Sequence, residues 1–140
     1  MIQNKNYRYF LFAALYFVQG AILSYFITFN ILYLREFKYT TAEVGFFQSL
    51  LAIPFILKIF FGLISDAWNP FKLGHRKPFI IFGLILQAIA MYAITYICPK
   101  TNLETFAIIA LIASTGMALY DTCTDGLALD TSTEKDRGIV

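Results

Sequence analysis

The chain alternates four long apolar stretches with short polar ones. The apolar stretches cover residues 9–34, 44–64, 78–97 and 105–129. Each is long enough to cross a bilayer, because a helix rises about 1.5 Å per residue and needs about 20 residues for a hydrocarbon core of about 30 Å. Helices are expected because a strand open to lipid would leave its backbone groups unpaired. The pattern predicts an all-α integral membrane protein with four spans.

Local signals mark two helix starts and one weak point. Thr41 in "YTTAE" is the expected N-cap of the second span, and Pro78 suits the first turn of the third span, where its missing N–H costs nothing. Pro54 lies inside the second span, cannot donate to the helix and leaves the Leu50 carbonyl without its usual partner. With Gln48 within two turns, this stretch is more typical of a cavity lining than of a lipid-facing surface.

Composition agrees with a membrane protein and excludes several classes of function. Hydrophobic residues make up 59% of the chain and charged residues 14%, whereas soluble domains carry about 25% charged residues. The net charge of +2 provides no basic surface for nucleic acid. Because the sequence shows no soluble domain, we predict that the chain is not an enzyme and has no cofactor or metal site. Cys98 and Cys123 lie near opposite ends of different spans, which argues against a disulfide.

The first span could be mistaken for a cleaved signal peptide, because Lys5 and Arg8 precede it. It is too long for the apolar region of a signal peptide, and no small-residue cleavage site with a polar mature chain follows it. We therefore expect this span to remain in the protein.

Basic residues in the loops predict the orientation. Seven Lys and Arg residues fall on one side of the membrane and three on the other: Lys5, Arg8, Lys72, Arg76, Lys77, Lys135 and Arg137 against Arg35, Lys38 and Lys100. Loops rich in Lys and Arg stay in the cytoplasm. We expect a multi-pass protein of the inner or plasma membrane with both termini, and the loop between the second and third spans, in the cytoplasm.

Charged residues also lie inside the spans, where they need a reason. Counted from Asp66 and Asp130 as the cytoplasmic helix ends, Lys58 lies eight residues in and Asp121 nine. Both are therefore about 12–14 Å deep, while Asp125 is about 7–8 Å deep on the same face as Asp121. A charge at the bilayer centre costs about 2.5–3.5 kcal/mol, so Lys58 and Asp121 are expected to pair. A snorkelling Lys58 and an interfacial Asp125 are the alternative interpretations.

Two further features extend this candidate site. Gln19 and Gly20 lie near the middle of the first span, where Gln19 suits a contact with a ligand or with another helix. The face of the fourth span that carries the acids continues through small residues that allow another helix to approach closely, namely Ala110, Ser114 and Ala118.

The stretch "GLISDAWNPFKLGHRKP", residues 62–78, resembles the cytoplasmic loop signature of the major facilitator superfamily. The matching residues are Gly62, Ser65, Asp66, Gly74, Arg76 and Lys77. The spacing between Asp66 and Gly74 is longer than in the usual signature, which indicates an insertion. This loop, together with "LYFVQG", "PFILK" and "DTCTDGLALD" followed by "EKDRG", is similar to a branch containing muropeptide permeases, acetyl-CoA transporters and folate–biopterin transporters.

The resemblance implies a secondary transporter of two six-helix halves, which binds its solute near the middle of the membrane and works by alternating access. The chain would then be the amino-terminal part of one half, as a truncated gene product or a piece of a longer record. Its expected partners are the bilayer, a small polar or anionic solute, protons and the remaining helices.

The resemblance also implies a gating latch on the cytoplasmic side. Asp66 and Arg76 would form the latch, with Glu134 and Arg137 as local partners; its other members are Gly62, Gly74 and Lys77. The interior residues Lys58, Asp121 and Asp125, with Gln19, are the candidate substrate or proton site. From the sequence, they could bind a solute, relay a proton or only fix the packing of the helices.

Two other classes of membrane protein compete with a transporter of this family. One is a self-contained four-helix exporter or channel that acts as a homo-oligomer, and the other is a scaffold that transports nothing. Small dimeric multidrug exporters depend on an acid in the first span, and residues 9–34 contain none.

Overall fold

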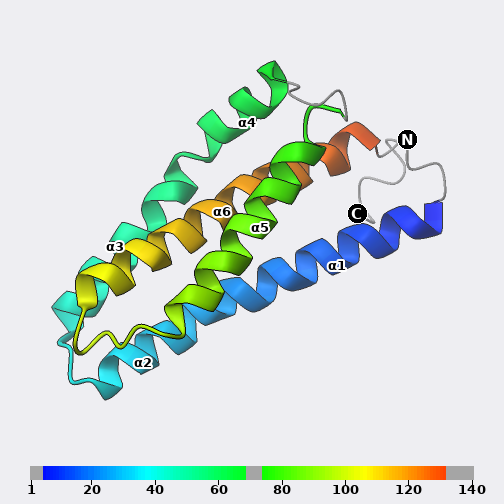
Figure 1. Cartoon of the computed structure of the whole chain (residues 1–140). Helices are drawn as coiled ribbons and strands as arrows, with labels where there is room; N and C mark the ends of the chain where they lie inside the picture. Colours follow the sequence, from blue (N-terminus) through cyan, green and yellow to red (C-terminus); the bar gives the residue numbers. More distant parts are fainter. Residues whose placement is uncertain (1–4, 69–73, 132–140) are drawn as a thin grey trace.

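The computed structural model describes residues 5–68 and 74–131 (Figure 1). Regular structure in these residues is helical, and four helical segments are long and apolar enough to cross a membrane: Asn6–Glu36, Thr41–Ala67, Lys77–Ile94 and Leu103–Thr131. The predicted all-α membrane fold is confirmed. The elements are α1 (Lys5–Ser24), a π-helical turn η1 (Tyr25–Phe29), α2 (Asn30–Glu36), α3 (Thr41–Ile56), α4 (Lys58–Ala67), α5 (Lys77–Ile94) and α6 (Leu103–Thr131).

The first span is one long helix interrupted by the π-helical turn. The N–H of Asn30 donates to the carbonyl of Tyr25, five residues earlier, so one residue is accommodated as a bulge. From α3, the side-chain amide of Gln48 donates to the carbonyl of Phe26 at 2.7 Å. The bulge in the first span is thus tied to the second span.

The second span starts one residue earlier than expected. Thr40, not Thr41, is the N-cap: its hydroxyl accepts from the N–H of Glu43 at 3.3 Å, and the Glu43 carboxylate accepts from the N–H of Thr40 at 2.7 Å. The Thr41 hydroxyl accepts instead from Arg35. Only Thr40 has a glutamate three residues later, so it is the threonine that can complete a capping box.

The second span is broken at Leu57, between α3 and α4. The break follows Pro54, which has no N–H to donate. The N–H of Phe60 donates to the Leu57 carbonyl at 3.0 Å, a tighter turn than that of an α-helix. As a result, Lys58 becomes the first residue of α4.

The third span begins at Lys77 with Pro78 in its first turn, as predicted. Its helix ends at Ile94, before the predicted limit of residue 97. The N–H groups of Thr95 and Tyr96 donate to carbonyls three residues earlier, at 3.3 and 3.2 Å, and so close the helix. The other three spans extend beyond their predicted limits because the helices include polar residues at their ends.

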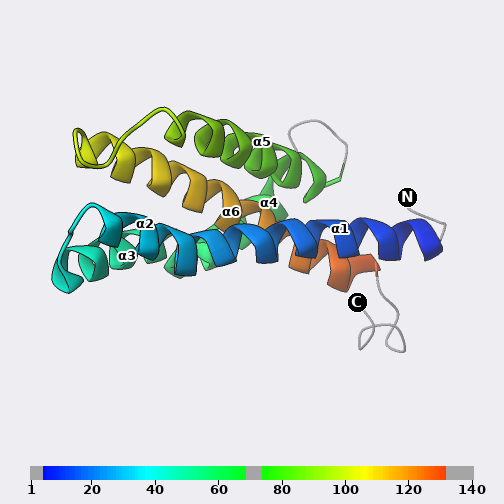
Figure 2. The ribbon, with the colours of Figure 1, turned by 90° about the horizontal axis from the view of Figure 1, so that it is seen from below.

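Helix α6 is the centre of the bundle. It contacts α1, α3, α4 and α5, and Figures 1 and 2 show it between α5 and the pair α3 and α4. Half of its most apolar window is buried, against 17% for each of the first two spans. The start of α1 and the end of α6 lie at the same end of the bundle (Figure 1). Residues on α6 are therefore placed to contact every other span.

Candidate functional site

Three carboxylates in the second half of α6 each bind a group from a different span. Asp121 pairs with Lys58 of α4, Asp125 accepts a hydrogen bond from Tyr16 of α1, and Asp130 pairs with Arg76 at the start of α5. The acids in the fourth span therefore join it to the other three.

The expected contact between Lys58 and Asp121 is present in the structure, where the lysine ammonium contacts Oδ2 of the carboxylate. The Asp121 side chain is 2% exposed and that of Lys58 is 33% exposed. The ammonium also lies 5.3 Å from the centre of the Phe55 ring. Lys58 is the first residue of α4, directly after the helix break, and its side chain reaches α6.

Several buried polar atoms within one helical turn of Asp121 on α6 have no hydrogen-bond partner among residues 5–68 and 74–131. They are the other carboxylate oxygen of Asp121, Oδ1, and the hydroxyls of Tyr120 and Thr124. In the first span, the buried Oε1 of Gln19 also has no hydrogen-bond partner among these residues. Most buried polar atoms in proteins are hydrogen-bonded, so this part of the bundle can accept or donate further hydrogen bonds.

Asp125 lies closer to the helix end and is exposed. Its Oδ1 accepts a hydrogen bond from the hydroxyl of Tyr16 at 2.8 Å. Sequence analysis did not single out Tyr16, but there was a signal: it precedes Gln19 by three residues and so shares its helix face. The structure does not pair Gln19 itself with any of the three acids.

The face of small residues on α6 packs as expected. Ala110, Ser114 and Ala118 are fully buried, and the Ser114 hydroxyl donates to the carbonyl of Leu51 in α3 at 2.6 Å. This contact confirms that the small residues allow another helix to approach closely.

A small cavity lies between η1, α3 and α6, next to the interior ion pair. It measures about 160 Å³, and its walls include Gln48, Ser114 and the Phe55 ring that contacts Lys58. The expectation that Gln48 lines a cavity is confirmed. Sites for small molecules usually measure about 300–1,000 Å³. The cavity is therefore smaller than most sites that enclose a whole small molecule.

The predicted latch residues Asp66 and Arg76 are in contact. Arg76 is the N-cap of α5, and its Nη2 lies 2.9 Å from Oδ1 of Asp66 at the end of α4. Its Nε lies 2.7 Å from Oδ2 of Asp130 near the end of α6. Sequence analysis used Asp130 only to mark the helix end and missed this role; the partners it named, Glu134 and Arg137, lie outside the described residues. One arginine thus joins the start of α5 to the ends of α4 and α6.

The remaining latch residues have separate roles in the structure. Gly62 faces Thr122 of α6, and a Cβ there would lie 3.5 Å from Cγ2 of Thr122, an ordinary van der Waals distance, so this contact does not require a glycine. Gly74 has a φ of +100°, which favours glycine. Lys77 makes no ion pair within residues 5–68 and 74–131, and it lines a groove between α1 and α5.

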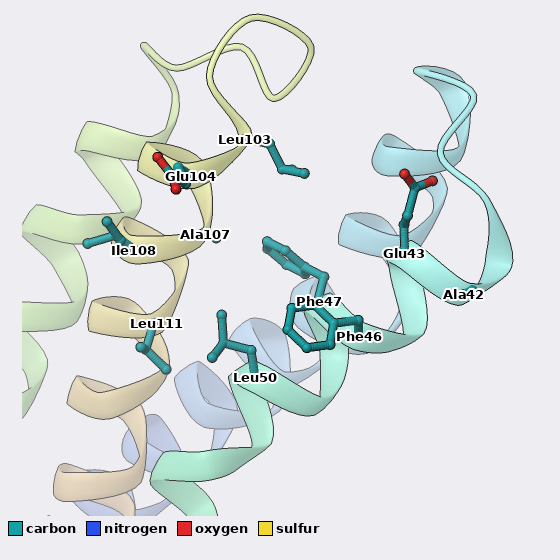
Figure 3. A pocket seen from close by; sticks show the side chains of 10 residues that line it. All are labelled: Ala42, Glu43, Phe46, Phe47, Leu50, Leu103, Glu104, Ala107, Ile108 and Leu111. Atoms are coloured by element: carbon teal, nitrogen blue, oxygen red, sulfur yellow. The ribbon is translucent and has the colours of Figure 1, made fainter.

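A larger groove of about 850 Å³ lies between the other ends of α3 and α6 (Figure 3). Ten residues line it: Glu43 and Glu104 are acidic, and the other eight are apolar. Figure 3 shows both carboxylates near the ends of the helices, away from Leu50 and Leu111. A polar solute would find few groups to bind there, so the chemistry favours the region around Lys58 and Asp121 despite its smaller cavity.

Comparison with known proteins gives the same picture as the residues. The sequence family described as Major Facilitator Superfamily matches residues 9–140. The chain is 32% identical over 120 residues to "Putative transporter AmpG 3" of Rickettsia prowazekii (strain Madrid E), covering 79% of this chain and 28% of that protein. It is 25% identical over 122 residues to "Probable folate-biopterin transporter 7" of Arabidopsis thaliana, covering 86% of this chain and 27% of that protein. No solved structure matches significantly.

The chain therefore spans a little over a quarter of the length of these curated relatives. The match to both of them agrees with the branch that the sequence motifs indicated.

Proposed function

Since the chain belongs to the major facilitator superfamily of transporters, we propose that it forms part of a secondary active transporter for a small polar or anionic solute. The observation that carries this proposal is the state of Asp121. One of its oxygens contacts Lys58, and the other is buried without a hydrogen-bond partner among the described residues. A buried carboxylate with one free oxygen, beside a lysine, can exchange its partner for a proton or a solute.

Charge balance suggests how the pair would work. In the empty state the charges of Lys58 and Asp121 cancel. If an anionic group of the solute takes the place of the carboxylate at Lys58, Asp121 is left with an uncompensated charge, which costs about 2.5–3.5 kcal/mol at the bilayer centre. A proton on Asp121 removes this cost. Proton and anion would then move together, and both the empty and the loaded site would be neutral.

The neighbouring residues would support this exchange. Gln19 in the first span offers a buried amide oxygen that accepts a hydrogen bond from the solute. Asp125 and Tyr16 hold α1 against α6, nearer the end at which α6 finishes. Alternating access requires contacts that break and reform, and both the Tyr16 contact and the ion pairs of Arg76 are of this kind. We propose that Asp66, Arg76 and Asp130 close the cytoplasmic side.

Solute uptake into membrane vesicles tests the proposal. The protein, as its gene encodes it, is expressed and the vesicles are given a pH gradient together with folate, biopterin and a panel of small carboxylates. The matched control is the double variant Lys58→Met with Asp121→Leu, which removes both charges together and should preserve the packing.

We expect the native protein to accumulate at least one of these solutes, and to lose accumulation when the pH gradient is collapsed. The double variant should be equally abundant and inactive. Equal uptake by the native protein and the double variant would remove the pair from the mechanism. The proposed substrate class would be contradicted if vesicles with the protein took up none of the polar and anionic solutes faster than vesicles without it.

A further inference from the structure

The Arg76 side chain lies directly over the backbone of Gly126 in α6. A Cβ atom built on Gly126 would overlap Nη1 and Cζ of Arg76 and would lie 2.8 Å from its Nε. Gly126 follows Asp125 and precedes Asp130 by four residues, so it lies one helical turn before a carboxylate that Arg76 binds.

Arg76 can move aside only if it leaves the two carboxylates that hold it or if both of them move with it. Its Nη2 is held by Asp66 at 2.9 Å and its Nε by Asp130 at 2.7 Å, which leaves Nη1 as the nitrogen nearest the Gly126 backbone. The guanidinium is planar and rigid, so a shift that clears a methyl group at Gly126 also draws the other two nitrogens away from their carboxylates. The space above Gly126 therefore fixes where the guanidinium can bind both acids.

Helix α6 itself does not require a glycine at this position. Among the described glycines only Gly74 has a positive φ, so the backbone of Gly126 is open to any residue. Alanine is the better helix former, because glycine loses more backbone freedom on folding. Gly20 and Gly45 differ from Gly126, since a Cβ at either would meet nothing within 4 Å.

We infer that Gly126 is a positioning residue of the latch: the absence of a side chain there seats Arg76 between Asp66 and Asp130. This inference rests on the latch in the proposed function. It predicts an unusual combination, in which Gly126→Ala favours the helix and yet opens the contact between the ends of α4, α5 and α6.

Cys123 provides a native reporter that needs no substrate. It is fully buried in α6, beside Ser65 of α4 and close to the charge of Arg76. In a Cys98→Ser background, the rate at which N-ethylmaleimide labels Cys123 in membranes measures how often the ends of α4 and α6 separate. We compare Gly126→Ala, Arg76→Ala, the double variant of both, and Gly20→Ala as the matched control.

Gly126→Ala is expected to raise the labelling rate several-fold, to the level of Arg76→Ala, and Gly20→Ala should leave it unchanged. The double variant should label no faster than Arg76→Ala alone, because Gly126 acts through that side chain. If Gly126→Ala labels at the native rate, or if the two changes multiply in the double variant, the inference is wrong.

Local opening can be separated from general loosening and from a failure of transport. In a Cys123→Ser background, Gly126→Ala should not change the labelling of Cys98, which lies beyond the far end of α5; a parallel rise there would show general unfolding and overturn the inference. Labelling does not depend on solute flux. The positioning role can therefore hold even if none of the tested solutes is transported.

Discussion

Asp121 is almost fully buried, whereas a third of the side chain of Lys58, its ion-pair partner, remains exposed. Loss of Lys58 and loss of Asp121 therefore have different consequences. Without Lys58, the Asp121 carboxyl group stays buried and must either keep a charge with no opposite charge or take up a proton, and both lower stability. Without Asp121, the long lysine side chain can turn its ammonium toward water or the lipid headgroups. The two charges contribute unequally to stability although they form one pair.

We therefore predict that Lys58→Ala destabilises the protein more than Asp121→Ala does. The first change should cost about 3 kcal/mol, the lower end for a broken buried ion pair, and the second clearly less. The double variant should be more stable than Lys58→Ala alone, because no charge is left unpaired. Thermal unfolding of detergent-purified protein measures all three. If the effects of the single changes add in the double variant, the residues do not interact.

The sequence predicted this pair because depth can be counted along a helix from its polar end. The same argument could not find the partner of Asp125, because Tyr16 is uncharged and is one of nine Tyr residues; its shared helix face with Gln19 was a signal, but it does not show that the hydroxyl faces an acid. It also missed Asp130 as a partner of Arg76, because a carboxylate at a helix end has an ordinary explanation in water. Counting depth along a helix identifies charges that must pair inside the membrane, but it does not identify the partners of charges that can remain in water.

At the scale of elements, the backbones of α5 and α6 approach each other closely at two facing glycines. A Cβ on Gly83 would lie 2.8 Å from the carbonyl oxygen of Gly116, and one on Gly116 would lie 2.8 Å from the carbonyl oxygen of Gly83. Backbone atoms cannot turn aside as a side chain can. Two mid-span glycines were the available signal, but the sequence did not show that they face each other; analysis of small residues identified only the face of α6 toward α3.

We expect Gly83→Ala to destabilise the protein by about 1–3 kcal/mol, the usual cost of overpacking a closely packed contact. Gly45→Ala, in α3, is the matched control, since a Cβ there meets nothing within 4 Å and alanine favours the helix. The two variants should shift the midpoint of thermal unfolding in opposite directions, or leave the control unchanged. Similar losses in both would indicate that helix contact is not the reason for the glycine at position 83.

For the whole molecule, the two ends of the bundle differ in charge and in construction. One end holds Arg76 with Asp66 and Asp130, and the arginine Arg8 donates there to the carbonyl of Thr131, the last residue of α6. A cation at the C-terminus of a helix, as Arg8 is at that of α6, is favoured by the helix dipole. The other end has the capping box of Thr40 and Glu43 and the turn after α5. Helix ends rich in arginine and lysine are those expected in the cytoplasm.

The predicted orientation can be tested by labelling single cysteines with a membrane-impermeant maleimide in intact cells. Cys98 and Cys123 are first replaced by serine, and a cysteine is placed at His75 or at Asn102, both of which are exposed. We expect Asn102→Cys to react and His75→Cys to react only after the membrane is permeabilised. The opposite pattern would place both termini outside the cell.

The central position of α6 also determines how the chain can be made. Synthesis reaches this helix last among the four spans, and Tyr16, Lys58 and Arg76 precede their partners in it by 109, 63 and 54 residues. Until α6 leaves the ribosome, Lys58 has no counter-charge in the membrane, and the first three spans have little to pack against. Packing of these four spans must therefore wait for α6, and a nascent chain that stops before residue 103 would leave Lys58 in the membrane without the partner that it has in the structure.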